Sequence, residues 1–151
     1  MESGVDSDEL FVVSKVWNAD QGYESTLKAF DASLERLGLD SLDLYLIHWP
    51  VDDKYKETWR AMEQLYAEKR LKAIGVSNFM QHHLEELLST AKVVPMVNQM
   101  EFHPYVVQQG LIDYCTSKGI QYEAWSPFMQ GKVFNLDSAK RAIGNFTVLA
   151  G

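Results

Sequence analysis

The stretch Leu42-Asp-Leu-Tyr-Leu-Ile-His-Trp-Pro50 decides the fold of this chain. Its apolar run is too short for a core helix and is stopped by a proline, a pattern typical of a fully buried parallel strand. His48 is the last strand-like residue before the chain must turn. Because α/β proteins place their chemistry at the carboxyl ends of parallel strands, His48 is the first candidate for a functional site.

Four further strands are predicted on either side of this stretch, and helices are predicted between them. The strands cover residues 9–17, 71–76, 93–100 and 120–124. The first helix ends near Leu37, where Leu27, Phe30 and Leu34 form one apolar stripe and Gly38 is a natural C-cap. The other helices are expected at about 54–69, around 84–88 and at about 107–118.

Parallel strands that alternate with helices build either an open doubly wound sheet or a (β/α)8 barrel. The chain has 151 residues, and this length favours the open sheet, since a complete barrel typically needs about 250 residues. The motifs described below favour the barrel.

Composition excludes several classes of function. The net charge of -7 argues against a broad nucleic-acid surface, which needs a basic stripe. No apolar run is long enough to span a bilayer, so no membrane partner is expected. The single cysteine, Cys115, rules out an internal disulfide and lies at helical spacing from Leu111, which predicts a buried thiol. These features predict a cytoplasmic protein.

Polar groups gather at the predicted strand ends and form one rim. The rim comprises Lys15, His48, Ser77 with Asn78, Asn98 with Gln99, and Trp125 with Ser126. No spacing of His, Cys or Asp suits a metal, and the adjacent His82 and His83 are expected to point apart on a helix surface. This set suits an uncharged planar ligand with an amide, such as nicotinamide. Lys15 alternatively faces water as an edge-strand lysine.

Five ordered stretches carry a resemblance to a known family. They are Ser-Lys-Val-Trp-Asn (14–18), Asp-Leu-Tyr-Leu-Ile-His-Trp-Pro (43–50), Ala-Ile-Gly-Val-Ser-Asn-Phe (73–79), Val-Asn-Gln-Met-Glu-Phe-His-Pro (97–104) and Glu-Ala-Trp-Ser-Pro-Phe (123–128). The sequence closely resembles the aldo-keto reductases, and within them the bacterial and protozoal reductases of the diketone, glyoxal and prostaglandin type. The resemblance predicts an α/β fold, a partial (β/α)8 TIM barrel over residues 1–134 that corresponds to about strands three to seven, followed by a divergent tail at 135–151.

The resemblance also implies residue roles in hydride transfer from NADPH to the carbonyl carbon of a small aldehyde or ketone. Lys15 would lower the pKa of a catalytic tyrosine, and His48 would orient the carbonyl. Trp17 and Trp49 would line the substrate pocket. The residues expected to bind the cofactor are Ser77, Asn78 and Gln99 at the carboxamide, Trp125 against the nicotinamide ring, and Ser126, Phe128, Gln130 and Gly131 near the pyrophosphate.

The departures from the family pattern leave three alternative functions for the chain. The acid tyrosine and its aspartate would lie upstream of Met1, and the residues that bind the 2′-phosphate are absent as well. The first expectation is therefore an impaired reductase whose exposed sheet edges favour self-association. The second is a non-catalytic α/β module. The third is an enzyme whose barrel is completed by a partner chain.

Overall fold

A computed structural model describes residue 5 and residues 9–135 of the chain. Its sheet contains β1 (Val13–Val16), β2 (Leu42–Ile47), β3 (Leu71–Ser77), β4 (Val97–Glu101) and β5 (Gln121–Trp125). The helices are α1 (Tyr23–Leu37), α2 (Tyr55–Ala67), α3 (Gln81–Leu88) and α4 (Gln109–Ser117). Two short 3-10 segments, η2 (Asn18–Asp20) and η3 (Met129–Asn135), follow β1 and β5.

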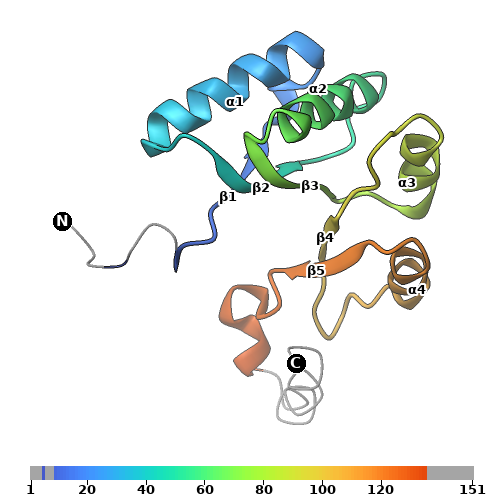
Figure 1. Cartoon of the computed structure of the whole chain (residues 1–151). Coiled ribbons are helices and arrows are strands. Elements are labelled where there is room, and N and C mark those ends of the chain that lie inside the picture. Colours follow the sequence, from blue (N-terminus) through green and yellow to red (C-terminus); the bar gives the residue numbers. More distant parts are fainter. Residues whose placement is uncertain (1–4, 6–8, 136–151) are drawn as a thin grey trace.

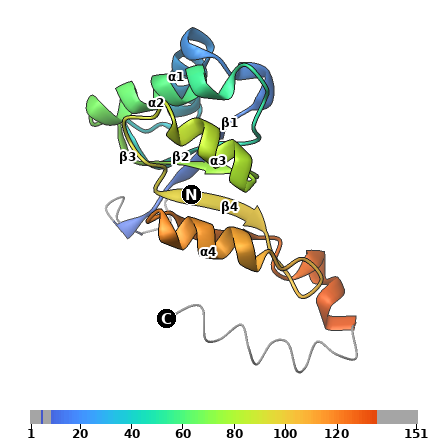
Figure 2. The ribbon, with the colours of Figure 1, turned by 90° about the vertical axis from the view of Figure 1, so that its right-hand side faces the viewer.

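All five strands are parallel and lie in the sheet in their sequence order, β1-β2-β3-β4-β5. The sheet curves, and the four helices lie along its convex side (Figure 1). Figure 2 looks at this side, with α3 and α4 in front of the strands. A doubly wound sheet carries helices on both faces. The one-sided arrangement is that of part of a (β/α)8 barrel, which confirms the predicted fold class.

The hydrophobic core lies between the sheet and the helices. Tyr45 and Ile47 on β2 point into it, together with Trp59 on α2. On α1 the predicted stripe is confirmed at Phe30, which is fully buried. Gly38 ends this helix in the left-handed conformation with φ 66°, which a residue without a Cβ adopts without strain.

The opposite face of the sheet is held together by a close approach at Gly75. The pairing register places Lys15, Leu46 and Gly75 in one row across β1, β2 and β3. A Cβ atom on Gly75 would lie 2.7 Å from Leu46 Cδ2 and 2.7 Å from the carbonyl oxygen of Val97. The glycine therefore lets a leucine side chain lie across the middle strand.

Two strands begin later than their apolar patterns predict. Strand β4 was expected from residue 93 but starts at Val97. Pro95 has no N–H for a ladder, and Val93 bonds instead to α2, accepting from Trp59 Nε1 at 3.2 Å and donating to Glu63 Oε1 at 2.9 Å. Strand β1 was expected from residue 9 but starts at Val13.

A side chain takes the place of one backbone partner just before β1, where the carbonyl oxygen of Val12 still accepts from the backbone N–H of Leu44 at 3.3 Å. Asp43 on β2 accepts from the backbone N–H of Val12 at 2.7 Å and forms an ion pair with Lys72 at 2.7 Å. The hydrogen bond from Lys72, followed by that from Val12, holds the pKa of Asp43 below its usual range. This carboxylate therefore ties the first strand of the sheet to β2 and β3.

The two adjacent histidines on α3 do not point apart as the sequence pattern predicts. Their ring centroids lie 3.8 Å apart, and the two Nε2 atoms lie 3.0 Å apart. The reason is the N-terminus of α3, where His83 Nδ1 accepts from the backbone N–H of Met80 at 3.1 Å. That bond turns the His83 ring back along the helix and toward His82.

From residue 136 on, the divergent tail of the sequence analysis lies outside the described residues. In the part of the chain that the structure does describe, no helix combines the length and the apolar character that a membrane span requires.

The contact at Gly75 predicts an asymmetry between two glycine substitutions. Gly75→Ala should lower the free energy of unfolding by about 1–3 kcal/mol, because the new methyl group overlaps Leu46 and a backbone carbonyl. Gly110→Ala is the matched control, since Gly110 lies within α4 and, apart from its chain neighbours and the backbone of its own helix, no described atom lies within 4 Å of its Cβ position. That control should be neutral or stabilising by up to about 1 kcal/mol. Urea denaturation measures both, and equal effects would contradict the packing argument.

The histidine pair predicts a loss of stability in mild acid. Burial, together with the neighbouring His82, lowers the pKa of His83. The neutral ring therefore contributes stability that is present above the ordinary pKa of histidine and is lost as the pH falls through the lowered pKa. The variant His83→Gln keeps a hydrogen-bond acceptor but does not titrate.

In urea denaturation the unchanged chain should lose more stability than His83→Gln between about pH 7.5 and pH 5. Parallel losses in the two proteins over that range would show that His83 is not the responsible group.

Candidate functional site

The carboxyl ends of β1 and β2 bring three of the predicted residues together. The rings of Trp17 and His48 lie with their centroids 4.9 Å apart. Burial, and then the positive charge of Lys15, lower the pKa of His48, so its imidazole is neutral at pH 7. Lys15 is half-buried and forms no ion pair with any residue that the structure describes. The ammonium group of Lys15 and the imidazole of His48 are therefore near enough to interact electrostatically.

Asn78 connects the next strand ends to one another. Its amide nitrogen donates to the carbonyl oxygen of His48 at 2.9 Å and to Ser77 Oγ at 3.1 Å. Its Oδ1 accepts from the indole N–H of Trp125 at 2.9 Å, and its backbone N–H donates to the carbonyl oxygen of Gln99 at 2.9 Å. The residue has φ 64°, a conformation that asparagine tolerates better than most side chains. The amide thus spans β2, β3 and β5.

Gln99 faces the same rim from β4 and is held by a residue that the sequence did not single out. Its amide nitrogen donates to Glu123 Oε1 at 2.6 Å, across the paired strands β4 and β5. The signal available in the sequence was the period of two along β5, which puts Glu123 on the same face as Trp125. Ser77 completes this part of the rim by donating to the carbonyl oxygen of Gln99 at 2.9 Å.

The predicted rim included Asn98, and this prediction is wrong. Asn98 is fully buried on the helix side of the sheet, where its amide nitrogen donates to the carbonyl oxygen of Phe79 at 2.9 Å. Cys115 Sγ lies 3.8 Å from the same nitrogen, in the buried position predicted for the thiol. Consecutive strand residues point to opposite faces, so Asn98 and Gln99 cannot share the rim.

The remaining predicted residues lie at the margins of the rim. Trp49 is 45% exposed, and only its backbone is fixed, because its carbonyl oxygen accepts from Gln21 Nε2 at 2.7 Å. After β5 the chain makes a tight turn with positive φ at Ser126 (56°), Gln130 (56°) and Gly131 (84°). Non-glycine residues in this conformation are uncommon and gather at ligand sites. Phe128 is exposed and stacks on Phe134, with ring centroids 5.7 Å apart.

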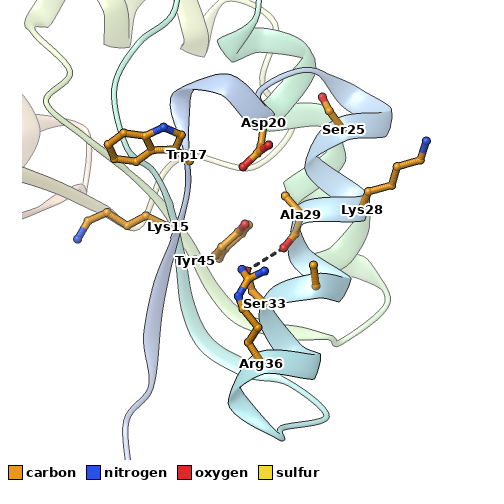
Figure 3. Close-up of a pocket in the computed structure, with 10 residues that line it drawn as sticks. Lys15, Trp17, Asp20, Ser25, Lys28, Ala29, Ser33, Arg36 and Tyr45 are labelled. Atoms are coloured by element: carbon orange, nitrogen blue, oxygen red, sulfur yellow. Dashed lines mark hydrogen bonds between the residues drawn. The ribbon is translucent and has the colours of Figure 1, made fainter.

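A hollow of about 420 Å³ lies beside the rim, between β1 and α1 (Figure 3). Its lining residues are Lys15, Trp17, Asp20, Ser25, Lys28, Ala29, Ala32, Ser33, Arg36 and Tyr45. Figure 3 shows Tyr45 between the strand and the helix, whereas Lys15 extends away on the other side of β1. Among the described residues, the buried hydroxyl of Tyr45 has no hydrogen-bond partner. The hollow therefore adjoins the strand-end site but does not include His48, Gln99 or Trp125.

The tyrosines with perturbed pKa values are unsuited to proton donation. Burial raises the pKa of Tyr45 to about 12, and burial also raises the pKa values of Tyr55, Tyr114 and Tyr122. An acid that works near neutral pH needs a pKa shifted down toward that range. Over the described residues, no cluster of three or more His, Cys, Asp or Glu side chains could hold a metal ion.

Comparison with known proteins places this geometry among oxidoreductases. The model of the aldo/keto reductase family matches residues 1–148. Glyoxal reductase of Bacillus subtilis is 66% identical over 134 residues, which are 89% of this chain and 49% of that protein. The 9,11-endoperoxide prostaglandin H2 reductase of Trypanosoma cruzi is 54% identical over 131 residues, 87% of this chain and 46% of that protein. The chain thus spans about half the length of the curated relatives it matches.

Solved structures agree with this comparison. MGS-M4, an aldo-keto reductase from a deep-sea metagenome library of the Medee basin, superimposes with a TM-score of 0.87 and 49% identity, over 95% of this chain and 54% of that chain. A variant of Gox0644 in complex with NADPH superimposes with a TM-score of 0.86 and 40% identity, over 94% of this chain and 53% of that chain.

The proximity of Lys15 and His48 predicts a coupled titration. Lys15→Met should raise the pKa of His48, because the variant removes the nearby positive charge that disfavours the imidazolium. Lys28→Met is the control, since Lys28 lies on α1 at the hollow and should leave His48 unchanged. Titration of the His48 ring protons by NMR measures both shifts. An unchanged His48 pKa in Lys15→Met would show that the charge of Lys15 does not act on the imidazole.

Proposed function

The chain belongs to the aldo/keto reductase family, and from this premise we propose that its strand-end rim is the cofactor-facing side of an NADPH-dependent reductase of small aldehydes and ketones. The observation that supports the proposal most directly is the convergence of Lys15, His48, Gln99 and Trp125 at the carboxyl ends of the parallel strands. NADPH is proposed as the cofactor because the similar Gox0644 variant was solved in complex with it.

The residues present fit the nicotinamide end of this cofactor. Gln99 leaves its amide oxygen unused by any described residue, and the indole of Trp125 is fixed by Asn78 at 2.9 Å. We therefore assign Ser77, Asn78 and Gln99 to the carboxamide and Trp125 to the nicotinamide ring. The turn with Ser126, Phe128, Gln130 and Gly131 is assigned to the pyrophosphate. Bound there, NADPH would supply the hydride.

His48 and its neighbours are assigned to the carbonyl substrate. The neutral imidazole can donate an N–H to the carbonyl oxygen and so orient the carbon for reduction. Trp17, whose ring lies against His48, and Trp49 are proposed to line the substrate pocket. The catalytic role of Lys15 is to lower the pKa of the acid by its positive charge.

Among the described residues, none of the tyrosines with a perturbed pKa is proposed as the proton donor. The tyrosines with raised pKa values lie in the helix layer or the hollow, and none of them shows the lowered pKa that the acid requires. Loss of a general acid typically slows a reaction by about 10²–10⁴-fold. We therefore propose that these residues alone form an impaired reductase, and that the acid is supplied by a further segment or by a second chain.

The unpaired edges of β1 and β5 could bind the segment or chain that supplies the acid. Each of these strands pairs with one neighbour only among the described residues, and an unpaired strand edge favours association with another chain. Self-association through these edges is accordingly part of the proposal, and sedimentation measures it. A chain that remains monomeric at high concentration and does not bind NADPH would instead be the non-catalytic module.

The decisive experiment measures NADPH binding and NADPH oxidation with methylglyoxal on the same sample. We expect binding, with turnover about 10²–10⁴-fold below that of the similar glyoxal reductase because the acid is missing. His48→Ala should remove what turnover remains, whereas Lys15→Met should lower the turnover only if a further segment or a second chain supplies the acid on which Lys15 acts. Lys118→Met, an exposed residue directly after α4, is the control and should change nothing.

Two results would contradict the proposal. Turnover that persists undiminished in His48→Ala would place the chemistry elsewhere. Absence of NADPH binding would exclude the rim as a cofactor site.

A further inference from the structure

We infer that Glu123 fixes the orientation of the Gln99 amide and thereby makes the rim select a ligand with a primary carboxamide over the same ligand with a carboxylate. The inference rests on the proposed function, because it concerns the head group of the proposed cofactor. It adds the residue that sets this selectivity and the chemical group that is rejected.

The geometry of the pair comes from the sheet itself. Gln99 and Glu123 are direct partners in the register of β4 and β5. Gln99 Nε2 donates to Glu123 Oε1 at 2.6 Å, a short distance typical of a hydrogen bond to a charged group. Both side chains are half-buried, so the bond is partly shielded from water. The strand pairing therefore holds two complementary side chains opposite each other before any ligand arrives.

The chemistry of the carboxylate decides which end of the amide is offered to a ligand. An ionised carboxylate only accepts hydrogen bonds, so the nitrogen end of Gln99 has to face Glu123. The oxygen end is left over, and it accepts from no residue that the structure describes. A fixed acceptor at this place binds a ligand that donates an N–H, as a primary carboxamide does.

The same arrangement disfavours a carboxylate in that position. A carboxylate has no hydrogen to donate to Gln99, and its charge would lie close to the charge of Glu123. A second carboxylate, Glu101, lies on the same face of β4 and contacts His103 at 3.2 Å. The rim next to Gln99 is therefore acidic. An anionic head group would meet the amide oxygen of Gln99, to which it cannot donate, and would be repelled by the negative charges of the two glutamates.

The test compares the binding of NADPH with that of its analogue in which nicotinic acid replaces nicotinamide. The two probes differ only in the carboxamide, and isothermal titration calorimetry gives both dissociation constants. The full chain should bind NADPH at least about tenfold more tightly than the acid analogue.

The variant Glu123→Gln should reduce this preference at least about fivefold, mainly through tighter binding of the acid analogue. A glutamine at position 123 can donate or accept, so it no longer dictates the orientation of the Gln99 amide. Asp40→Asn is the matched control, because it removes one negative charge from an exposed loop and should keep the preference of the full chain. Glu123→Ala provides a second variant that removes the acceptor altogether and should act in the same direction.

The outcomes separate this inference from the proposed function. If NADPH and the acid analogue bind with equal affinity, or if Glu123→Gln keeps the full preference, the selectivity role of Glu123 is wrong while the cofactor site stands. If neither dinucleotide binds, the proposed cofactor site is wrong, and the inference about Glu123 is wrong as well. A uniform loss of affinity for both probes in Glu123→Gln would show a structural role only.

Discussion

The site depends on one amide, that of Asn78, which spans the carboxyl ends of the strands. Its nitrogen donates to the carbonyl oxygen of His48, and its oxygen accepts from the indole of Trp125. No aliphatic side chain of similar size could replace it, because the contacts need a donor and an acceptor on one rigid group. The backbone N–H of the same residue donates to the carbonyl oxygen of Gln99, so one residue links the backbones of His48 and Gln99 to the indole of Trp125.

The fold could be predicted from the sequence because its signals are local. The continuous apolar run from Leu42 to Ile47 identifies a buried strand, and the stripe on α1 identifies its covering helix. The residues at which strands begin were harder to predict, because they depend on partners distant in the sequence. The N–H of Val12 donates to the side chain of Asp43, while only its carbonyl oxygen bonds to the backbone of β2, and Val93 bonds to α2. Both strands therefore begin later than their apolar character predicts.

The placement of side chains at the strand ends could be predicted where one residue per strand end defines it, as at Lys15 and His48. Placement could not be predicted where it depends on neighbouring residues in the fold. Asn98 and Gln99 are equally polar, and only the alternation along β4 separates the buried residue from the exposed rim. Glu123 is important only because it accepts a hydrogen bond from Gln99 on another strand. The two histidines of α3 converge because a backbone N–H at the helix start captures one of them.

The strict sequence order of the strands has a consequence for how the chain acquires this structure. Each strand pairs only with the strand made just before it and the strand made just after it, so every βα unit can dock as soon as it has been synthesised. Loop-closure costs stay small at each step because no strand waits for a distant partner. Trp125, at the end of the last strand, is the exception: its bond to Asn78 reaches across 47 positions and closes only when assembly of the sheet is finished. The rim that includes Asn78 and Trp125 is therefore complete only after β5 has joined the sheet.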